Sequence, residues 1–215
     1  MFEGFSPETV DFLWGIRMNN NRDWFLSHKP EYVKYLYEPM KQLGWELFQP
    51  FMDSPGDIYK VSRIYRDARL HHPLPYKESL WICIRQDVQW WAENPCLYFE
   101  INPEGVDYGF FIWKMRPAAM KAFRAGIAAN PSEFLEIVPR VEAATGQQIA
   151  AAEYARPEKC DDPELERFFR WKEQISCSVH EDFSEATFGP ELAQRVSAHF
   201  AKVAPLYHYF NRFKV

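Results

Sequence analysis

Apolar residues recur at helical spacing near the start of the chain. The segment Ser6-Pro7-Glu8 is typical of a helix start, because Ser can cap the backbone and Pro needs no N–H at the first helical position. The predicted helix then presents one apolar face, formed by Phe12, Leu13 and Ile16. Asn19 to Asn21 predicts a break followed by a short helix, because Asn side chains compete for backbone hydrogen bonds.

A second apolar stripe predicts a longer helix from Lys29-Pro30 to about Met52. Its apolar positions begin at Tyr32 and continue at helical spacing to Leu47. Pro39 should kink or split this helix, because proline has no N–H for the carbonyl four residues earlier. The turn cluster Ser54-Pro55-Gly56-Asp57 closes the helical part of the chain.

Strand-favouring residues replace the helical pattern after this turn. They begin at Ile58, and three further strand candidates follow at about 79–86, 96–102 and 106–114. The last two alternate around the turn Asn102-Pro103-Glu104-Gly105, which predicts a hairpin. Strands joined this tightly must be antiparallel, so the sequence predicts an α+β fold with a small antiparallel sheet packed with several helices.

Proline residues mark the starts of most later helices. Predicted helices cover about 117–129, 131–144, 163–174 and 189–212, and weaker strand candidates cover about 148–155 and 175–180. The chain of 215 residues and 47% hydrophobic content is long enough for one good core. We therefore expect a single domain over 1–215, with a helical part at 6–52, a sheet core at 58–114 and a mainly helical part at 117–212.

The overall charge narrows the classes of partner. A net charge of −5 argues against broad attachment to nucleic acid or to an anionic membrane, because both need a wide basic face. No apolar run approaches the roughly eighteen residues that a spanning helix needs, and the chain begins without a secretory signal pattern. The four cysteines lack metal-type spacing. We expect a soluble, cytoplasmic protein, and the sequence leaves a homo-oligomer open.

The most informative stretch concentrates basic groups in an otherwise acidic chain. It runs from Lys60 to Arg69 and is followed by Pro75-Tyr76-Lys77. In a strand, side chains alternate, so one face would carry Arg63, Tyr65, Asp67 and Arg69. Guanidinium groups match carboxylate or phosphate in a bidentate manner, and Asp67 could hold one Arg or act as a base. The alternative is an ion-pair ladder at the surface, where each pair contributes only about 0–1 kcal/mol.

Two further segments could join this clamp. Asn20 and Arg22 lie at a predicted helix N-terminus, which favours anions, although Asn21 capping the helix is an alternative role for this turn. Tyr76 and Lys77 could bring a phenol and an ammonium group over the same pocket, or Lys77 could lie in solvent.

The sequence contains few features that indicate a metal site or a nucleotide-binding site. The neighbouring histidines His71 and His72 would point apart in an extended segment, so we expect no metal site. The strand carboxylates Glu100 and Asp107 could pair as acid and base in hydrolysis, but nothing in the sequence sets their separation. No phosphate-binding glycine loop is present, and we expect no cofactor.

Several motifs together resemble the domain of unknown function 2461 family. They are Phe5-Ser6-Pro7-Glu8-Thr9, Asn20 to Phe25 with Lys29 and Tyr32, Pro39-Met40, Arg63 to Asp67 with Arg69, Pro75-Tyr76-Lys77, Tyr98-Phe99, Pro103 to Gly105, Lys172, Pro205 and Phe210. The resemblance covers nearly the whole chain. It implies an α+β fold and a shared polar site, and it names no activity.

The chain departs from this family in two places. Leu70-His71-His72-Pro73-Leu74 is one residue shorter than the matching family segment, and the acidic residue and Lys usual there are absent. A Gly-rich part of the second hairpin strand is reduced to Gly109-Phe110-Phe111. Any family function of these segments is therefore in question for this chain.

Two functional hypotheses remain. The first is binding of a small anionic metabolite carrying phosphate or carboxylate, with or without catalysis. Its predicted ligand-binding residues are Asn20, Arg22, Arg63, Tyr65, Arg66, Arg69, Tyr76 and Lys77, with Asp67 as the candidate base. The second is a protein-interaction or structural module with a surface ion-pair ladder. The residues alone leave both open, and the family resemblance favours a site.

Overall fold

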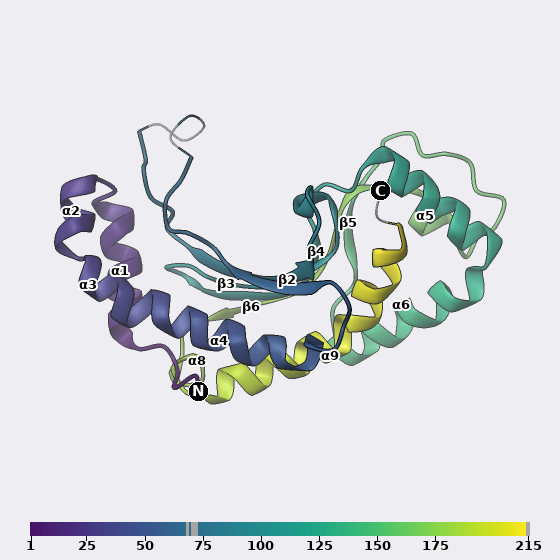
Figure 1. Ribbon diagram of the computed structural model, residues 1–215. Helices are drawn as coiled ribbons and strands as arrows, with labels where there is room; N and C mark the ends of the chain where they lie inside the picture. The colour runs from purple at the N-terminus through teal and green to yellow at the C-terminus, as the bar shows by residue number, and fades with distance from the viewer. Residues whose placement is uncertain (68, 70–72, 214–215) are drawn as a thin grey trace. The chain divides into compact units, whose positions relative to one another are not determined.

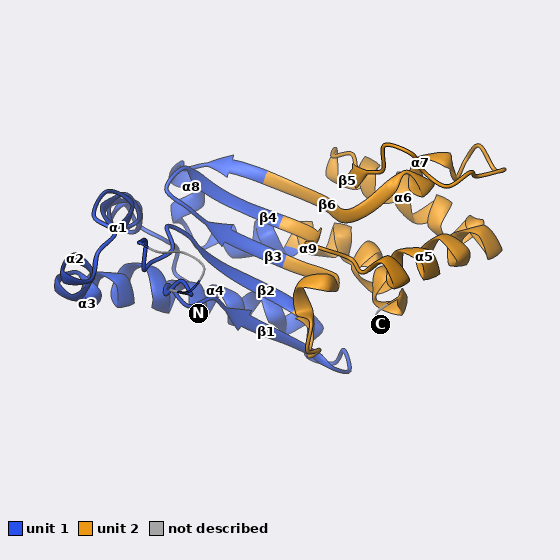
Figure 2. Cartoon of the chain, turned by 90° about the horizontal axis from the view of Figure 1, so that it is seen from above, with its two compact units in different colours: residues 1–84, 98–108, 180–197 blue, residues 85–97, 109–179, 198–215 orange. Residues whose placement is uncertain are grey.

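The computed structural model describes residues 1–67, 69 and 73–213. Its strands form a six-stranded antiparallel sheet in the order β1-β2-β3-β4-β6-β5, with helices packed on it, which confirms the predicted α+β class. The chain divides into two compact units, which Figure 2 shows in different colours. Unit 1 contains residues 1–84, 98–108 and 180–197, and unit 2 contains residues 85–97, 109–179 and 198–215. The expectation of a single domain stays a prediction.

The N-terminal helices follow the predicted order. They are α1 (Pro7–Met18), α2 (Arg22–Ser27), α3 (Lys29–Glu31), the π-helix η1 (Tyr32–Tyr37), α4 (Glu38–Phe48) and the 3-10 helix η2 (Gln49–Phe51). The predicted apolar face of α1 is buried. Asn21 caps α2 by accepting a hydrogen bond from the backbone N of Trp24 at 3.0 Å, so the capping role is confirmed.

Pro39 changes the long helix without ending it. The segment before it winds as a π-helix, a form that often marks a disturbed helical ladder. Proline cannot donate to the carbonyl of Tyr35, four residues earlier. That carbonyl instead accepts a hydrogen bond from the hydroxyl of Thr9 on α1, at 2.6 Å. A residue of a neighbouring helix thus supplies a donor at the point where proline removes one.

The strands confirm most of the predicted ones. They are β1 (Asp57–Val61), β2 (Leu80–Gln86), β3 (Cys96–Ile101), β4 (Gly105–Ile112), β5 (Ala150–Glu153) and β6 (Trp171–Asp182). The predicted hairpin joins β3 to β4, and the backbone N of Asn102 donates to the carbonyl of Gly105 at 3.0 Å. β5 pairs antiparallel with β6, with Ala151 opposite Ile175.

One predicted helix is wrong. The segment expected to be helical over 163–174 contains only the short helix α7 (Glu166–Phe169), and strand β6 begins at Trp171. Trp171 and Ile175 are both buried and are four residues apart. Because four is close to one helical turn and is also an even number, this spacing fits a helix face and a strand face equally. Pairing with a neighbouring strand decides the outcome.

Unit 1 has its core where α4 packs on the sheet. Met40 and Leu43 of α4 are fully buried. A Cβ atom at Gly44 would lie 3.1 Å from the ring of Tyr59 on β1 and 3.5 Å from Ile82 on β2. Glycine at this position therefore allows the helix to lie close to both strands. Unit 1 also contains the short helix α8 (Glu185–Phe188) and the first part of α9 (Glu191–Phe210).

Unit 2 is built on a cluster of aromatic rings. Its remaining elements are η3 (Trp91–Glu93), α5 (Pro117–Ala129), α6 (Pro131–Thr145) and η4 (Asn211–Phe213), together with the end of α9. The ring of Phe134 on α6 lies 5.2 Å from Phe123, 4.9 Å from Phe168 and 4.8 Å from Tyr209. Much of the aromatic content thus fills the core. No helix in the described part of the chain is long and apolar enough to cross a membrane.

Candidate functional site

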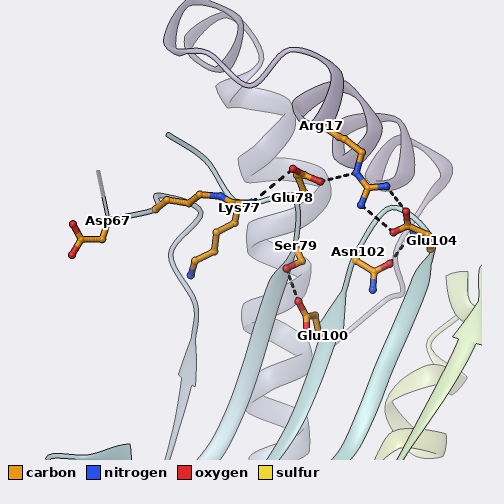
Figure 3. Close-up of a pocket in the computed structure, with 9 residues that line it drawn as sticks. Arg17, Asp67, Lys77, Glu78, Ser79, Glu100, Asn102 and Glu104 are labelled. Atoms are coloured by element: carbon orange, nitrogen blue, oxygen red, sulfur yellow. Dashed lines mark hydrogen bonds and ion pairs between the residues drawn. The ribbon is translucent and has the colours of Figure 1, made fainter. Parts of the chain in front are cut away.

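The candidate site is a polar pocket of about 500 Å³ within unit 1. Its walls come from α1, from the loop between β1 and β2, and from the β3–β4 hairpin (Figure 3). The lining residues are Arg17, Arg66, Asp67, Lys77, Glu78, Ser79, Glu100, Asn102 and Glu104. Arg66, Asp67 and Lys77 belong to the set predicted from sequence. The pocket combines cations and carboxylates in a small volume.

Arg17 of α1 neutralises two of the carboxylates. Its Nε donates to Glu78 Oε2 at 2.7 Å, and its terminal nitrogens bind Glu104, one of them donating to Oε2 at 3.1 Å (Figure 3). The hydrogen bond from Arg17 lowers the pKa of Glu104. Because this guanidinium is already engaged on both sides, Arg17 closes one wall of the pocket and leaves little positive charge for a ligand.

Arg66 and Asn20 hold the chain segment that presents Lys77. Arg66 Nε donates to the carbonyl of Tyr76 at 2.6 Å, and its terminal nitrogen lies 3.7 Å from Glu78 Oε1. The side chain of Asn20 donates to the carbonyl of Tyr76 and accepts from its backbone N, each at 3.0 Å. A reciprocal amide pair of this kind fixes the backbone of Tyr76, and so it positions the residue that follows.

Lys77 is the cation that remains available. Its side chain is half-buried in the pocket and has no hydrogen bond or ion pair with any described residue. Its Nζ lies 5.4 Å from the centre of the Trp81 ring, which gives a weak cation–π contact. Burial lowers the pKa of Lys77, the charges of Arg63 and Arg66 lower it further, and Glu100 opposes them. A desolvated, unpaired ammonium group favours an anionic partner.

Glu100 of β3 shows the opposite perturbation. Burial raises the pKa of its carboxyl group, and the hydrogen bond from Ser79 partly offsets this effect. Ser79 Oγ donates to Glu100 Oε1 at 2.5 Å. Perturbed acids and bases that share one cleft are typical of functional sites, although ion-pair networks perturb pKa values as well.

The predicted row of side chains on one strand face is wrong. β1 ends at Val61, and in the described residues that follow it Tyr65 pairs with Tyr76 in an isolated bridge. The hydrogen bonds from Arg66 N to the Pro75 carbonyl, at 2.9 Å, and from Lys77 N to the Ile64 carbonyl, at 2.7 Å, hold this bridge. Alternation therefore does not continue from Arg63 to Arg69. The basic groups reach the pocket from a loop.

Two predicted aromatic residues lie outside the pocket lining. The Tyr76 side chain is only 4% exposed, and its ring stacks on Phe25 with the centroids 4.3 Å apart. Tyr65 is exposed and packs edge-on against Phe25. Both rings thus take part in packing between α2 and the loop after β1.

Three of the predicted charged residues do not line the pocket: Arg22, Arg63 and Arg69. Asp67 lines the pocket and forms an ion pair with Arg69. Arg22 and Arg63 are exposed and have no hydrogen bond or ion pair within the described part of the chain. Arg69 Nη2 lies 2.6 Å from Asp67 Oδ2, and the Arg69 side chain is 87% exposed. This pair has the geometry of the alternative interpretation, a surface ion pair.

The sequence did not indicate five of the lining residues as site residues: Arg17, Glu78, Ser79, Asn102 and Glu104. Glu78 and Ser79 directly follow Lys77 in the sequence, so their place between a basic segment and a predicted strand could have indicated them. Arg17 and Glu104 meet although 87 positions separate them, and no local pattern indicates such a contact. Glu100 was a candidate acid or base, and its neighbours could be named only from the structure.

The described residues contain no group of three or more His, Cys, Asp or Glu side chains that could hold a metal ion. His71 and His72, considered as ligands from sequence, lie outside the described residues.

A comparison with protein-family models identifies a family that the chain matches. A protein-family model described as "Conserved hypothetical protein (DUF2461)" matches residues 8–209. No curated protein matches the chain. The matched range includes every residue that lines the pocket.

Proposed function

This chain belongs to the DUF2461 family of conserved hypothetical proteins, and from that premise we propose that it binds a small anionic ligand in the unit 1 pocket. The ligand carries a phosphate or carboxylate group. The observation that supports this proposal most directly is Lys77, a half-buried residue that lines the pocket and whose ammonium group has no hydrogen bond or ion pair with a described residue. Partial burial weakens the solvation of this charge, so an anionic ligand that pairs with it gains affinity.

Two nearby arginines add to the positive potential. The charges of Arg63 and Arg66 both lower the pKa of Lys77, and an anion bound at Lys77 would be attracted by the same two charges. Arg63 is exposed and unpaired within the described chain, so it can turn toward a bound ligand. Lys77 would provide a point charge, and Arg63 a planar fork that matches carboxylate or phosphate.

Catalysis is a separate part of the proposal. Asp67 lies at the pocket, and acting as a base would require it to release Arg69. Glu100 is held inside the pocket by Ser79, and its raised pKa brings it closer to the range in which a carboxyl group exchanges protons near neutral pH. Glu100 is therefore the better candidate for a proton-transferring group if the ligand is a substrate.

The second candidate function is an interaction or structural module. The observation that favours it is the exposed pair between Asp67 and Arg69, together with exposed aromatic side chains such as Tyr65 and Trp14. This function predicts self-association or a protein partner and no stabilisation by small anions.

Thermal unfolding with a panel of phosphorylated and dicarboxylic metabolites tests the proposal. We expect one ligand class to raise the melting temperature, because a ligand that binds only the folded state at 100 times its Kd stabilises it by about 2.7 kcal/mol. Lys77→Met should weaken binding about tenfold or more, since a hydrogen bond to a charged group contributes about 1.5–3 kcal/mol. Arg63→Ala should weaken it as well.

Lys60→Met is the matched control. Lys60 is an exposed residue of β1 that does not line the pocket, so its replacement removes one positive charge from unit 1 without touching the site. Equal losses of affinity in Lys60→Met and Lys77→Met would show that the loss reflects the net charge of unit 1 and not a contact between Lys77 and the ligand. No shift with any ligand, combined with a concentration-dependent dimer, would favour the interaction module.

A further inference from the structure

The charged groups that line the pocket fall into two sets. Most are paired inside the chain: Arg17 with Glu78 and Glu104, Arg66 with Glu78, and Asp67 with Arg69. Lys77 and Glu100 form the second set. Neither makes an ion pair with a residue in the described ranges. The pocket thus leaves one cation and one carboxyl group for a ligand.

Lys77 and Glu100 do not pair with each other. Their nitrogen and oxygen atoms are more than 4.0 Å apart, because no ion pair joins these two described residues. They nevertheless line the same pocket, and each acts on the pKa of the other. Lys77 lies in the loop before β2 and Glu100 lies on β3, so the two groups approach the pocket from different elements (Figure 3). A bridging molecule can contact both.

Glu100 retains capacity to accept a hydrogen bond. Its Oε1 accepts from Ser79 at 2.5 Å, and its Oε2 accepts from no described residue. Glu100 is a partly buried residue, so a ligand can reach its second carboxyl oxygen, and a donor there would offset part of the cost of burying the carboxyl group. Hydroxyl and ammonium groups are the donors that small metabolites commonly carry.

We propose that the ligand of this pocket carries an anionic group that binds Lys77 and, a few bonds away, a hydroxyl or ammonium group that donates to Glu100. This inference rests on the proposed function, because it takes anion binding at Lys77 as given. It narrows the ligand class from any small anion to hydroxy or amino derivatives of phosphates and carboxylates. Simple alkyl phosphates and alkyl carboxylates would leave Glu100 without its donor.

Three probes of equal chain length test this proposal by titration calorimetry: ethyl phosphate, 2-hydroxyethyl phosphate and 2-aminoethyl phosphate. The matched carboxylates are propionate, 3-hydroxypropionate and 3-aminopropionate. We expect at least one hydroxyl or amino probe to bind about tenfold more tightly than its alkyl counterpart, which is the contribution of one hydrogen bond to a charged group.

Two variants separate hydroxyl from ammonium. Glu100→Gln keeps an acceptor oxygen and removes the negative charge, so it should abolish a preference for the amino probe and preserve part of a preference for the hydroxyl probe. Glu100→Met removes the acceptor and should abolish both preferences. The alkyl probe should bind both variants at least as tightly as the wild-type chain, because each replacement removes a carboxylate near Lys77, and this binding also shows that the variants fold.

The outcomes separate this inference from the proposed function. Suppose that the three probes of a set bind with equal affinity and that Lys77→Met lowers the affinity for all three. The proposed anion site at Lys77 is then supported, and the proposed role of Glu100 is overturned. If a preference exists but survives in Glu100→Met, the donor binds elsewhere and the inference is again overturned. If no probe of either set binds, the proposed function itself fails. Should Glu100→Met not fold, the comparison of the wild-type chain with Glu100→Gln decides.

Discussion

At the scale of single residues, His180 lies between two carboxylates of unit 1. Its Nδ1 is 2.9 Å from Asp107 Oδ1, and its Nε2 is 3.4 Å from Asp182 Oδ1. The hydrogen bond with Asp107 is the main cause that raises the pKa of His180 above its ordinary value of 6.5, and Asp182 adds to it. The charged imidazole is therefore favoured in the folded chain.

This raised pKa predicts the direction of a pH dependence. A group whose pKa is higher in the folded state stabilises fully below its unfolded pKa, and this contribution is lost as pH rises through the folded value. We expect the free energy of unfolding, measured with urea, to include a part that falls from about pH 6.5 upward. His180→Gln should remove that part.

The control for this prediction is His208. It is exposed on α9 and has no carboxylate partner within the described ranges. His208→Gln should leave the pH dependence unchanged. If His180→Gln and the wild-type chain show the same slope between pH 6.5 and 8.5, the carboxylate contacts of His180 contribute no stability.

At the scale of elements, the junction of α1 with the long helix is the clearest case of one element compensating another. The Thr9 hydroxyl donates to the carbonyl that Pro39 cannot serve. We expect Thr9→Val to lower the free energy of unfolding by about 1–3 kcal/mol, because a partly buried carbonyl loses a donor and the shape is kept. Denaturant unfolding monitored by circular dichroism measures this change.

A double-mutant cycle isolates the contribution of the proline. Pro39→Ala restores an N–H that can reach the carbonyl of Tyr35, so Thr9→Val should cost less in that background. The hydroxyl of Thr9 also accepts a hydrogen bond from Ser6 N at 3.1 Å, and that loss is the same in both backgrounds. Equal costs in the two backgrounds would contradict the compensating role of Thr9.

Element boundaries show which local signals were sufficient. The predicted helix over 117–129 has the bounds of α5, because Pro117 starts it and Asn130 follows it. The predicted hairpin is confirmed because its turn and alternating residues lie within seventeen positions of one another. The predicted helix is wrong from Trp171 onward, where strand β6 begins. The four-residue spacing of its buried residues fits a helix and a strand equally, and only pairing with a neighbouring strand distinguishes the two.

At the scale of the whole molecule, the distribution of the four cysteines predicts one accessible thiol. None of the four is in a disulfide; Cys83, Cys96 and Cys177 are buried, and Cys160 is half-buried. Burial also raises the pKa of the Cys177 thiol, which slows its reaction further because the thiolate is the reactive form. A disulfide reagent at pH 8 should therefore modify one thiol quickly in the folded protein and the other three only after unfolding.

Cys160→Ser provides the matched test of this distribution. It should abolish the fast reaction and leave the slow reaction of three thiols unchanged. Two or more fast thiols in the wild-type chain would mean that the buried positions open on the time scale of the reagent.

The sequence alone determined the class of fold and the order of most elements. Periods of 3.6 and 2, together with Pro, Asn and Gly at their boundaries, act within short windows, so α1, α5 and the β3–β4 hairpin could be predicted locally. It also placed Lys77 in a basic segment next to a turn. These features depend on neighbours along the chain.

The tertiary structure decided which charges meet. Arg17 and Glu104 are 87 positions apart and form one wall of the pocket, whereas Asp67 pairs with Arg69, two positions away. The availability of Lys77 and Glu100 follows only after these pairs are known. Coulomb interactions and desolvation depend on distances in space, and the fold sets those distances for residues that the sequence keeps far apart.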